Sequence, residues 1–414
     1  MDVLIKDVTI IHKGSEFHLK TFDIQIRDGI IIKIENNIFS QDVEIVSGSK
    51  LICCVGLCDI GTQSGEPGYE HRETIYSLTR AALSGGYTAL AIFPETRPII
   101  QTKGDIQYLI NHTSRNGVKL FPIGALSKDN IGKDIGEYMD MKHAGAVAFS
   151  QGISSVRNTG LLGRSLQYAS VTGLSVLHHP DDHFLSEGGE MHEGDTSTMM
   201  GLKGIPSISE IHTLQRDILL VEYNGGKLIE HAISTEESIE IIRTAKNKGI
   251  NVFSTVPYLN LIFSDEDLVD FDTNLKVKPP IRSQKDRETL IAGLKDSTID
   301  AIISNHTPLD EESKNLEFPY ATPGASGIET CLAACITYLE NDLELEIILE
   351  KLTVGPRKLL NITIPEIRIG VKADICVIDT GEAWTFEKEN SLSKSLNNPF
   401  IGKTFKGKVI YTSV

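Results

Sequence analysis

The hydrophobic and polar positions of this chain change their period twice. In residues 1–52, β-branched residues alternate or cluster in short runs, which are separated by turns at Lys13-Gly14 and Asp28-Gly29. The same texture returns after about residue 366, in ADICVIDT and TFKGKVIYTSV. This pattern predicts one small β-sandwich domain built from both termini, residues 1–52 together with 366–414.

The middle of the chain, residues 53–365, alternates differently. Short apolar runs, each followed by a segment of helical period, recur at 51–60, 87–93, 118–124, 146–150, 174–179, 227–231, 251–255 and 299–304. Helices are expected at 70–83, 160–171, 207–221, 235–247 and 285–294. Strand followed by helix eight times predicts the α/β class and a (β/α)8 TIM barrel. An open doubly wound sheet is the alternative, but no glycine-rich phosphate fingerprint follows an early strand.

Charge and apolar content exclude several classes of protein. Lys and Arg total 40 against 56 Asp and Glu, which gives a net charge of −16. This balance argues against nucleic-acid partners and against anionic membrane surfaces, because both are bound through Lys and Arg. No run approaches the ~18 apolar residues of a membrane span, and the first residues lack the apolar stretch of a signal peptide. We therefore expect a cytoplasmic protein.

The cysteines indicate core positions rather than a disulfide framework. Cys54 with Cys58, or Cys331 with Cys335, has the spacing of half a zinc site. The favoured interpretation is that all six are small buried side chains in a reducing compartment. They are Cys53, Cys54, Cys58, Cys331, Cys335 and Cys376.

Polar residues gather where the predicted strands end. In a TIM barrel the functional groups come from the carboxyl ends of the strands. The segments at these ends are Asp59 to Gly68, Phe149 to Gly152, His178 to His183, Glu230-His231 and Ser304 to Pro308. The run at 178–183 has the composition of a metal cluster. Because adjacent strand residues point to opposite faces, only part of this run can converge on one ion.

Over nearly its whole length the chain resembles the dihydroorotases of the amidohydrolase superfamily. The resemblance rests on GLCDIGTQSGEPGYEHRETI, TRAALSGGYTALAIFPETRP, the EGD at 193–195, VKPPIR, NHTP, ATPGASGIET and the closing NNPFIGKTFKGKVIYT. It implies an amidohydrolase-type barrel with a zinc centre, and the interconversion of carbamoyl aspartate and dihydroorotate.

The residues that carry the family's chemistry are replaced in this chain. Gly61 and Gln63 stand at the zinc-binding histidine pair, and Gln151 stands at the acid after strand four. Asn305 replaces the aspartate that ligates metal and acts as general base, which an amide cannot do. Only two metal ligands of the family remain, His179 and His231, fewer than the three of a catalytic zinc site. The resemblance therefore implies a vestigial site with no catalytic residue and no metal cofactor.

The family's substrate contacts are also altered. Gly65 replaces an arginine that holds the substrate carboxylate, and Arg97 stands at its partner asparagine. Lys278 adds a cation in the Pro-Pro stretch. We expect a substrate-like pocket formed by Arg97, Lys278, His306, Pro323 and Gly324.

Three functions remain open from the sequence. The leading one is a catalytically inactive protein of pyrimidine biosynthesis that acts as a structural or regulatory partner of aspartate transcarbamoylase, as known non-catalytic members of the family do. The second is an active cyclic-amide hydrolase with zinc or manganese held by His179, His231 and Asp181. The third is a small-anion-binding protein that uses Arg97, Lys278 and Arg282. Barrels of this family commonly pair, so a homo-oligomer is expected.

Overall fold

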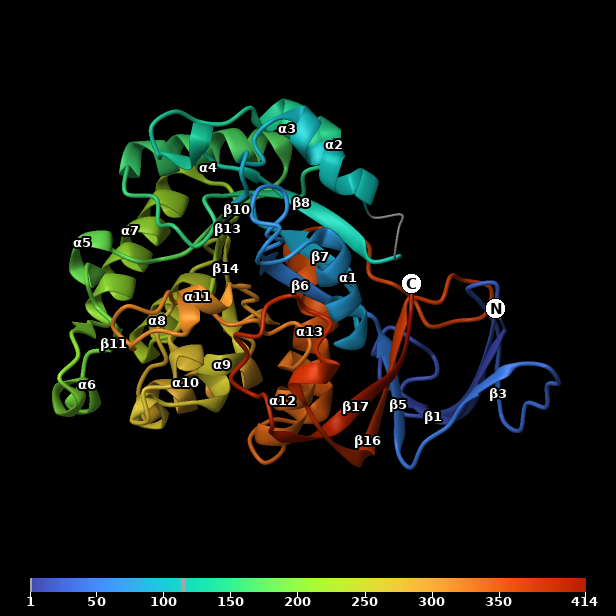
Figure 1. The fold of residues 1–414 in the computed structure, drawn as a ribbon. Helices are drawn as coiled ribbons and strands as arrows, with labels where there is room; N and C mark the ends of the chain where they lie inside the picture. Colours follow the sequence, from blue (N-terminus) through green and yellow to red (C-terminus); the bar gives the residue numbers. More distant parts are fainter. Residues whose placement is uncertain (1, 113–116) are drawn as a thin grey trace.

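Eight parallel strands form a nearly closed barrel, which confirms the (β/α)8 prediction (Figure 1). The computed structural model describes residues 2–112 and 117–414. Within these ranges the barrel strands are β6 (Leu57–Thr62), β7 (Tyr87–Ile92), β8 (Lys119–Ala125), β9 (Ala148–Ser150), β10 (Ser175–His178), β13 (Leu228–Glu230), β14 (Val252–Pro257) and β15 (Ala301–Ile303). Between β15 and β6, the Asp59 carboxylate accepts hydrogen bonds from the backbone N–H and the hydroxyl of Ser304, at 2.8 and 2.6 Å. These two bonds join the edges of the barrel.

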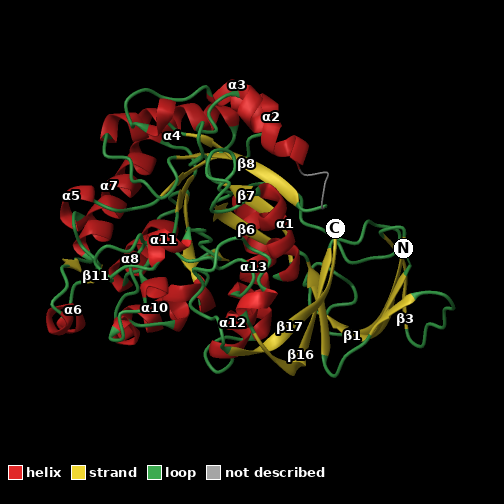
Figure 2. Ribbon diagram, viewed as in Figure 1, coloured by secondary structure: helices red, strands yellow, loops and turns green. Residues whose placement is uncertain are grey.

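Helices surround the strands, and polar caps fix where several begin (Figure 2). The main helices are α1 (Ile75–Ser84), α2 (Lys103–His112), α3 (Tyr138–Ala144), α4 (Thr159–Thr172), α7 (Ile208–Asn224), α8 (Glu236–Asn247), α10 (Gln284–Lys295) and α13 (Leu345–Leu359). Thr74, Asn158 and Ser283 cap α1, α4 and α10 by accepting a first-turn backbone N–H. The helix predicted over 70–83 therefore begins only after Thr74. The other four predicted helices match observed ones closely.

Shorter elements extend the loops that follow the strands. They are α5 (His183–Ser186), β11 (Met191–His192), α6 (Asp195–Met200), β12 (Gly204–Ile205), α9 (Tyr258–Ile262), α11 (Glu311–Lys314) and α12 (Cys331–Tyr338). Most of them lie in the long connections after β10 and β15, so these two strand ends carry the largest loops. None of the helices in the described ranges has the length and apolar character needed to cross a bilayer.

The two ends of the chain meet in a second sheet beside the barrel, where the first and last strands lie together in Figure 1. Its strands are β1 (Val3–Ile10), β2 (Thr21–Arg27), β3 (Ile30–Glu35), β4 (Glu44–Val46), β5 (Leu51–Val55), β16 (Ile375–Thr385) and β17 (Thr404–Ser413). One hydrogen-bonded path runs β17-β16-β5-β1-β2-β3, with β4 beside β1. The predicted run 51–60 is interrupted at Gly56, because β5 pairs with β1 and β16. Residues 53–55 thus lie in this sheet and not in the barrel.

Side chains of the barrel strands alternate between the interior and the layer beneath the helices. On β10, Leu177 packs inside the barrel, whereas Val176 belongs to the outer core. Continuing this alternation directs His178 outward and His179 toward the interior. Neighbouring histidines in the sequence therefore belong to different sites.

The cysteines occupy core positions, as predicted. All six are buried free thiols. Cys53 lies in the core of the terminal sheet, while Cys331 and Cys335 lie in the core beneath the barrel helices.

Candidate functional site

The two retained histidines lie buried in the barrel mouth, after β10 and β13. Nδ1 of His179 donates to the backbone oxygen of His231 at 3.1 Å, because a carbonyl can only accept; its Nε2 keeps a lone pair. His231 Nδ1 lies 3.2 Å from the Thr255 hydroxyl, and its Nε2 has no hydrogen-bond partner among the described residues. Burial lowers the pKa of His179 to about 4 and that of His231 to about 3. Both imidazoles are therefore neutral at pH 7.

The rings of His231 and Phe93 fill the space beside Gly61 that a metal-binding side chain from the first barrel strand would need. Gly61 has a φ of +83°, and a Cβ built there would lie 2.6 Å from Cε1 of His231 and 2.7 Å from a ring carbon of Phe93. The Phe93 ring stands edge-on to the His231 ring with centroids 5.0 Å apart. Gln63, two residues further on, donates its backbone N–H to the His306 carbonyl at 3.1 Å. No side chain can be added at position 61 without moving the two rings.

The amides that replace the family's acids are bonded to other groups. Gln151 is buried, and its Oε1 accepts a hydrogen bond from the Ser127 hydroxyl at 3.3 Å. Asn305 donates from Nδ2 to the backbone oxygen of Lys278 at 3.0 Å. Neither amide contributes an anionic oxygen to the mouth.

An ion pair divides the mouth into two cavities. Lys278 Nζ lies 2.9 Å from Oδ2 of Asp181. Both residues, with His183, line a cavity of about 240 Å³ and one of about 480 Å³. Burial is the largest influence on Asp181 and raises its pKa, but the nearby Lys278 and His179 and the hydrogen bonds from Lys278 and Ser186 together lower it by more, so the net pKa is lowered. Asp181, predicted as a metal ligand of a rebuilt site, is instead the counter-ion of Lys278.

Comparisons with known proteins place the chain among its relatives. Residues 49–238 match the family model described as Dihydro-orotase-like. A dihydroorotase of Acetivibrio thermocellus is 40% identical over 396 residues, which cover 95% of this chain and 93% of that protein. A dihydroorotase of Syntrophus aciditrophicus is 37% identical over 418 residues, covering 100% and 98%. This chain belongs to the dihydroorotase family.

Solved structures share the fold of this dihydroorotase-family chain at lower identity. The L-hydantoinase (dihydropyrimidinase) from Arthrobacter aurescens has a TM-score of 0.85 and 23% identity, covering 100% of this chain and 94% of its own. The dihydropyrimidinase from Brevibacillus agri has a TM-score of 0.82 and 19% identity, with coverage of 100% and 93%. These likenesses extend over both the barrel and the terminal sheet.

The mouth does not fit the metal centre that the dihydroorotase motif implies. Within the ranges that the structure describes, His179, His231 and Asp181 do not form a set whose ligand atoms all lie within 4.8 Å of one another. The Gly61 position is closed by aromatic rings, and the two imidazoles have no anionic oxygen as a third partner. Two neutral nitrogen donors are one ligand short of the usual three.

One set of three potential ligands does meet that distance in the described ranges, but it lies in the outer layer. It consists of His178, Asp217 and Glu230, all buried. His178 Nε2 accepts the backbone N–H of Val156 at 2.8 Å, so its proton resides on Nδ1, which faces the Asp217 carboxylate. A protonated Nδ1 cannot ligate a metal. This set is therefore an internal polar cluster, and the predicted metal-like run is split between two layers.

The predicted substrate pocket is only partly assembled. Lys278 lines both mouth cavities, and Pro323 lines the smaller. Arg97 lines neither cavity; its side chain is exposed, and its backbone N–H donates to the Pro67 carbonyl at 2.8 Å. Gly324 is buried; its backbone N–H donates to the Lys276 carbonyl at 2.8 Å, and its carbonyl accepts from Nζ of Lys314 at 3.0 Å.

His306 and Arg282 have structural partners. His306 is fully buried and lines neither mouth cavity, contrary to the prediction; its Nδ1 accepts the backbone N–H of Gly327 at 3.2 Å. Its other ring nitrogen lies 3.7 Å from the Glu73 carboxylate. Arg282 touches the smaller cavity but donates to the Ser234 hydroxyl at 3.0 Å. Both side chains are thus held by the protein itself.

Glu95, in the loop after β7, is an acid near the mouth that the sequence analysis did not single out, although it lines neither mouth cavity. Its carboxylate accepts the backbone N–H of Ile153 at 3.0 Å and packs where Gly152 has no side chain, since a Cβ there would lie 2.0 Å from Cδ of Glu95. Burial raises its pKa to about 7, although the Ile153 bond and the Lys278 charge act in the opposite direction. An acidic residue directly after a strand end, with a glycine after another strand, was the available signal.

Proposed function

We propose that this protein is a catalytically silent member of the dihydroorotase family that acts in pyrimidine biosynthesis. The observation that carries the proposal is the packing of Phe93 and His231 into the space beside Gly61. Metal-assisted hydrolysis requires about three protein ligands and an open position for water. Asn305 adds to the argument, because its amide has no accessible pKa for taking a proton from water.

Dihydroorotase assays in both directions, with added zinc or manganese, test this proposal. The dihydroorotase of Acetivibrio thermocellus serves as the positive control. We expect rates equal to those of the buffer, and far less than one equivalent of metal per chain by elemental analysis.

A second protein preparation distinguishes real turnover from a contaminating host enzyme. In the variant His179→Ala with His231→Ala, activity from a contaminant persists, whereas activity of this chain disappears. Turnover that is lost in the double variant would overturn the proposal. It would favour the active cyclic-amide hydrolase with a metal on His179, His231 and a third group.

We further propose that the protein is a cytoplasmic structural or regulatory partner of aspartate transcarbamoylase. The family's fold is retained over the full chain while the mouth has changed. Neighbouring helices α4 and α7 also expose Tyr168, Val171, Leu219 and Tyr223, and Tyr223 is 87% exposed. Exposed apolar side chains on two neighbouring helices support a protein contact at this surface.

Gel filtration of the protein with the transcarbamoylase of its own cell tests the partnership. We expect co-elution that Tyr223→Glu abolishes, with Tyr320→Glu as a control at an exposed tyrosine elsewhere. Separate elution of the two wild-type proteins would remove this partner. The same column, run with the protein alone, measures the predicted homo-oligomer.

A second function, the binding of a small anion, is supported by the position of Lys278 between the two mouth cavities. An anion that entered either cavity would compete with Asp181 for this ammonium group. Thermal-shift titration with dihydroorotate and carbamoyl aspartate, on wild type and Lys278→Ala, tests it. No shift with either compound in the wild type would count against this function.

A further inference from the structure

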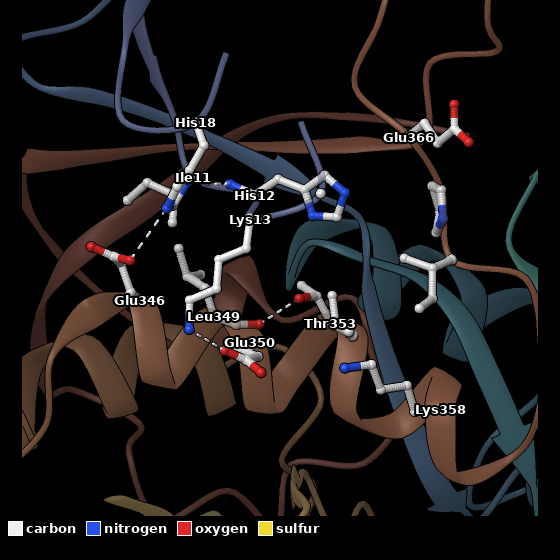
Figure 3. A pocket seen from close by; sticks show the side chains of 14 residues that line it. Ile11, His12, Lys13, His18, Glu346, Leu349, Glu350, Thr353, Lys358 and Glu366 are labelled. Atoms are coloured by element: carbon white, nitrogen blue, oxygen red, sulfur yellow. Dashed lines mark hydrogen bonds and ion pairs between the residues drawn. The ribbon is translucent and has the colours of Figure 1, made fainter. Parts of the chain in front are cut away.

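Another cavity, separate from the two cavities of the barrel mouth, lies between the β1–β2 loop and helix α13 (Figure 3). Its volume is about 470 Å³, within the range of small-molecule sites. The walls come from residues 11–14 and 18, from one face of α13, and from residues 364–366. None of these residues lines either mouth cavity. A ligand here would touch the terminal sheet and the barrel at once.

The acidic side chains of this cavity are already paired, which leaves one cation. Each acid has a basic partner: Glu350 with Lys13 at 2.6 Å, Glu346 with His18 at 3.5 Å, and Glu366 with Arg368. Lys358, on α13, has no ion pair within 4.0 Å in the described part of the chain, although it feels the field of Glu350. Lys358 therefore keeps an ammonium group that no described ion pair occupies and that a ligand can reach.

His12 provides a polar group beside this cation. The residue is only 8% exposed, and its imidazole makes no hydrogen bond to any described residue. Its backbone N–H is held by Nδ1 of His18 at 3.2 Å, which fixes the loop. Burial, with the nearby His18 and Arg357, lowers the pKa of His12, and Glu366 opposes this only in part. A neutral imidazole at a cavity wall offers one N–H donor and one acceptor.

The remaining lining is apolar and includes Ile11, Leu349, Val354, Ile364 and Pro365. We infer that this cavity binds a small organic monoanion. Its anionic group lies between the Lys358 ammonium and the His12 N–H, and its apolar body contacts the aliphatic wall. Figure 3 shows His12 on the loop side of the cavity and Lys358 on α13. The inference does not depend on whether the barrel mouth is active.

Benzoate and its neutral isostere benzamide are the probes, titrated into the full chain by calorimetry and ligand-observed NMR. We expect benzoate to bind more tightly than benzamide. Lys358→Ala should weaken benzoate about tenfold, the usual size of a lost charge-assisted bond. Its effect on benzamide should stay below about twofold, because no charge is involved. Lys358 is exposed, so this variant should fold like the wild type.

Two matched variants locate the binding. Lys278→Ala removes the cation of the barrel mouth, and Lys248→Ala removes an exposed cation at the end of α8. Neither variant should change the affinity for benzoate, which Lys358→Ala weakens. The inference is overturned if benzoate does not bind the wild type, if Lys358→Ala binds it equally well, or if only Lys278→Ala abolishes binding. The last result would place the anion in the mouth.

Discussion

The barrel mouth and the layer beneath α7 contain the same kinds of side chains in opposite situations. In the mouth, Asp181 is paired with Lys278, and the two histidines belong to no set of three potential metal ligands within 4.8 Å of one another in the described ranges. In the outer layer, Glu230 has two buried carboxyl oxygens that find no hydrogen-bond partner among the residues the structure describes, and it lies next to Asp217. Strand alternation places neighbouring residues in these separate regions. Two acidic side chains, Asp217 and Glu230, are therefore present in the molecule, but they lie in the outer layer and not in the mouth.

This difference predicts in which region a substitution will lower the free energy of unfolding most. Groups of the outer layer are fully buried and depend on each other, so their removal leaves unpaired charge. In the mouth, Lys278 is 35% exposed and lines both cavities, so its ion pair with Asp181 is open to screening by solvent. The variants below test this contrast, from the largest expected change in the free energy of unfolding to the smallest.

Asp217→Ala should have the largest effect. The Asp217 carboxylate accepts from Nδ1 of His178 and from Arg216, whose Nε lies 2.7 Å away. Its removal leaves the Arg216 cation and His178 without their partner, at a cost of about 3–5 kcal/mol. Urea unfolding at pH 7 measures the loss. Asp140→Ala, at an exposed site on α3, should change stability by less than ~0.5 kcal/mol. Equal losses in the two variants would contradict the contrast.

Gly61→Ala tests whether the mouth is closed. The new methyl group would lie 2.6 Å from the His231 ring, on a backbone with φ of +83°. We expect a loss of about 2–4 kcal/mol from strain and overpacking together. Gly173→Ala is the matched control, since Gly173 has a φ of +73° and nothing within 4 Å of the added atom. The control should lose only about 1 kcal/mol from backbone strain. If both variants lost the same amount, the space beside His231 would be open.

The barrel was predictable because strand and helix periods alternate regularly over residues 53–365. Its first boundary was not, because the apolar run 51–60 is continuous and only Gly56 marks the change from β5 to β6. The departures from the family's motif at Gly61, Gln63, Gln151 and Asn305 were visible as residue types, since glycine and amides cannot replace imidazole and carboxylate as zinc ligands.

Pairings between distant residues were invisible in the sequence. Nothing near Asp181 or Lys278 indicates that they form an ion pair, and nothing near His306 indicates that it faces Glu73. Arg97 was placed in the pocket by its position in a motif, but its side chain is exposed and lines neither mouth cavity. Such contacts depend on how separate loops fold over the same strand ends.

Glu230→Gln should change how stability depends on pH. Burial, together with the charge of Asp217, raises the pKa of Glu230 well above its ordinary value of 4.5. The folded wild type therefore keeps this proton while the unfolded chain loses it above pH 4.5, so wild-type stability falls as the pH rises toward the folded pKa. The slope from this group is at most about 1.4 kcal/mol per pH unit.

Urea unfolding at pH 5, 6, 7 and 8 measures this effect. Glutamine cannot ionise, so the free energy of unfolding of the variant should increase relative to that of the wild type at each step toward higher pH. Glu222→Gln, at an exposed site on α7, should run parallel to the wild type. Parallel curves for Glu230→Gln as well would mean that Glu230 is ionised in the folded protein.

Lys278→Ala should have the smallest effect on stability, less than about 1 kcal/mol, because the Lys278 side chain is 35% exposed and its ion pair is screened by solvent. The pKa of Asp181 should nevertheless rise, since burial then acts without the opposing charge. In the wild type, the stability that Asp181 contributes is present above its ordinary pKa of 3.8 and is lost as the pH falls through the lowered folded pKa. The variant should lose this contribution at higher pH. Carboxyl ¹³C NMR measures the Asp181 pKa directly, and Lys278→Arg should leave it low. A large loss of stability in Lys278→Ala would show that the mouth is as interdependent as the layer beneath α7, and the contrast between the two regions would fail.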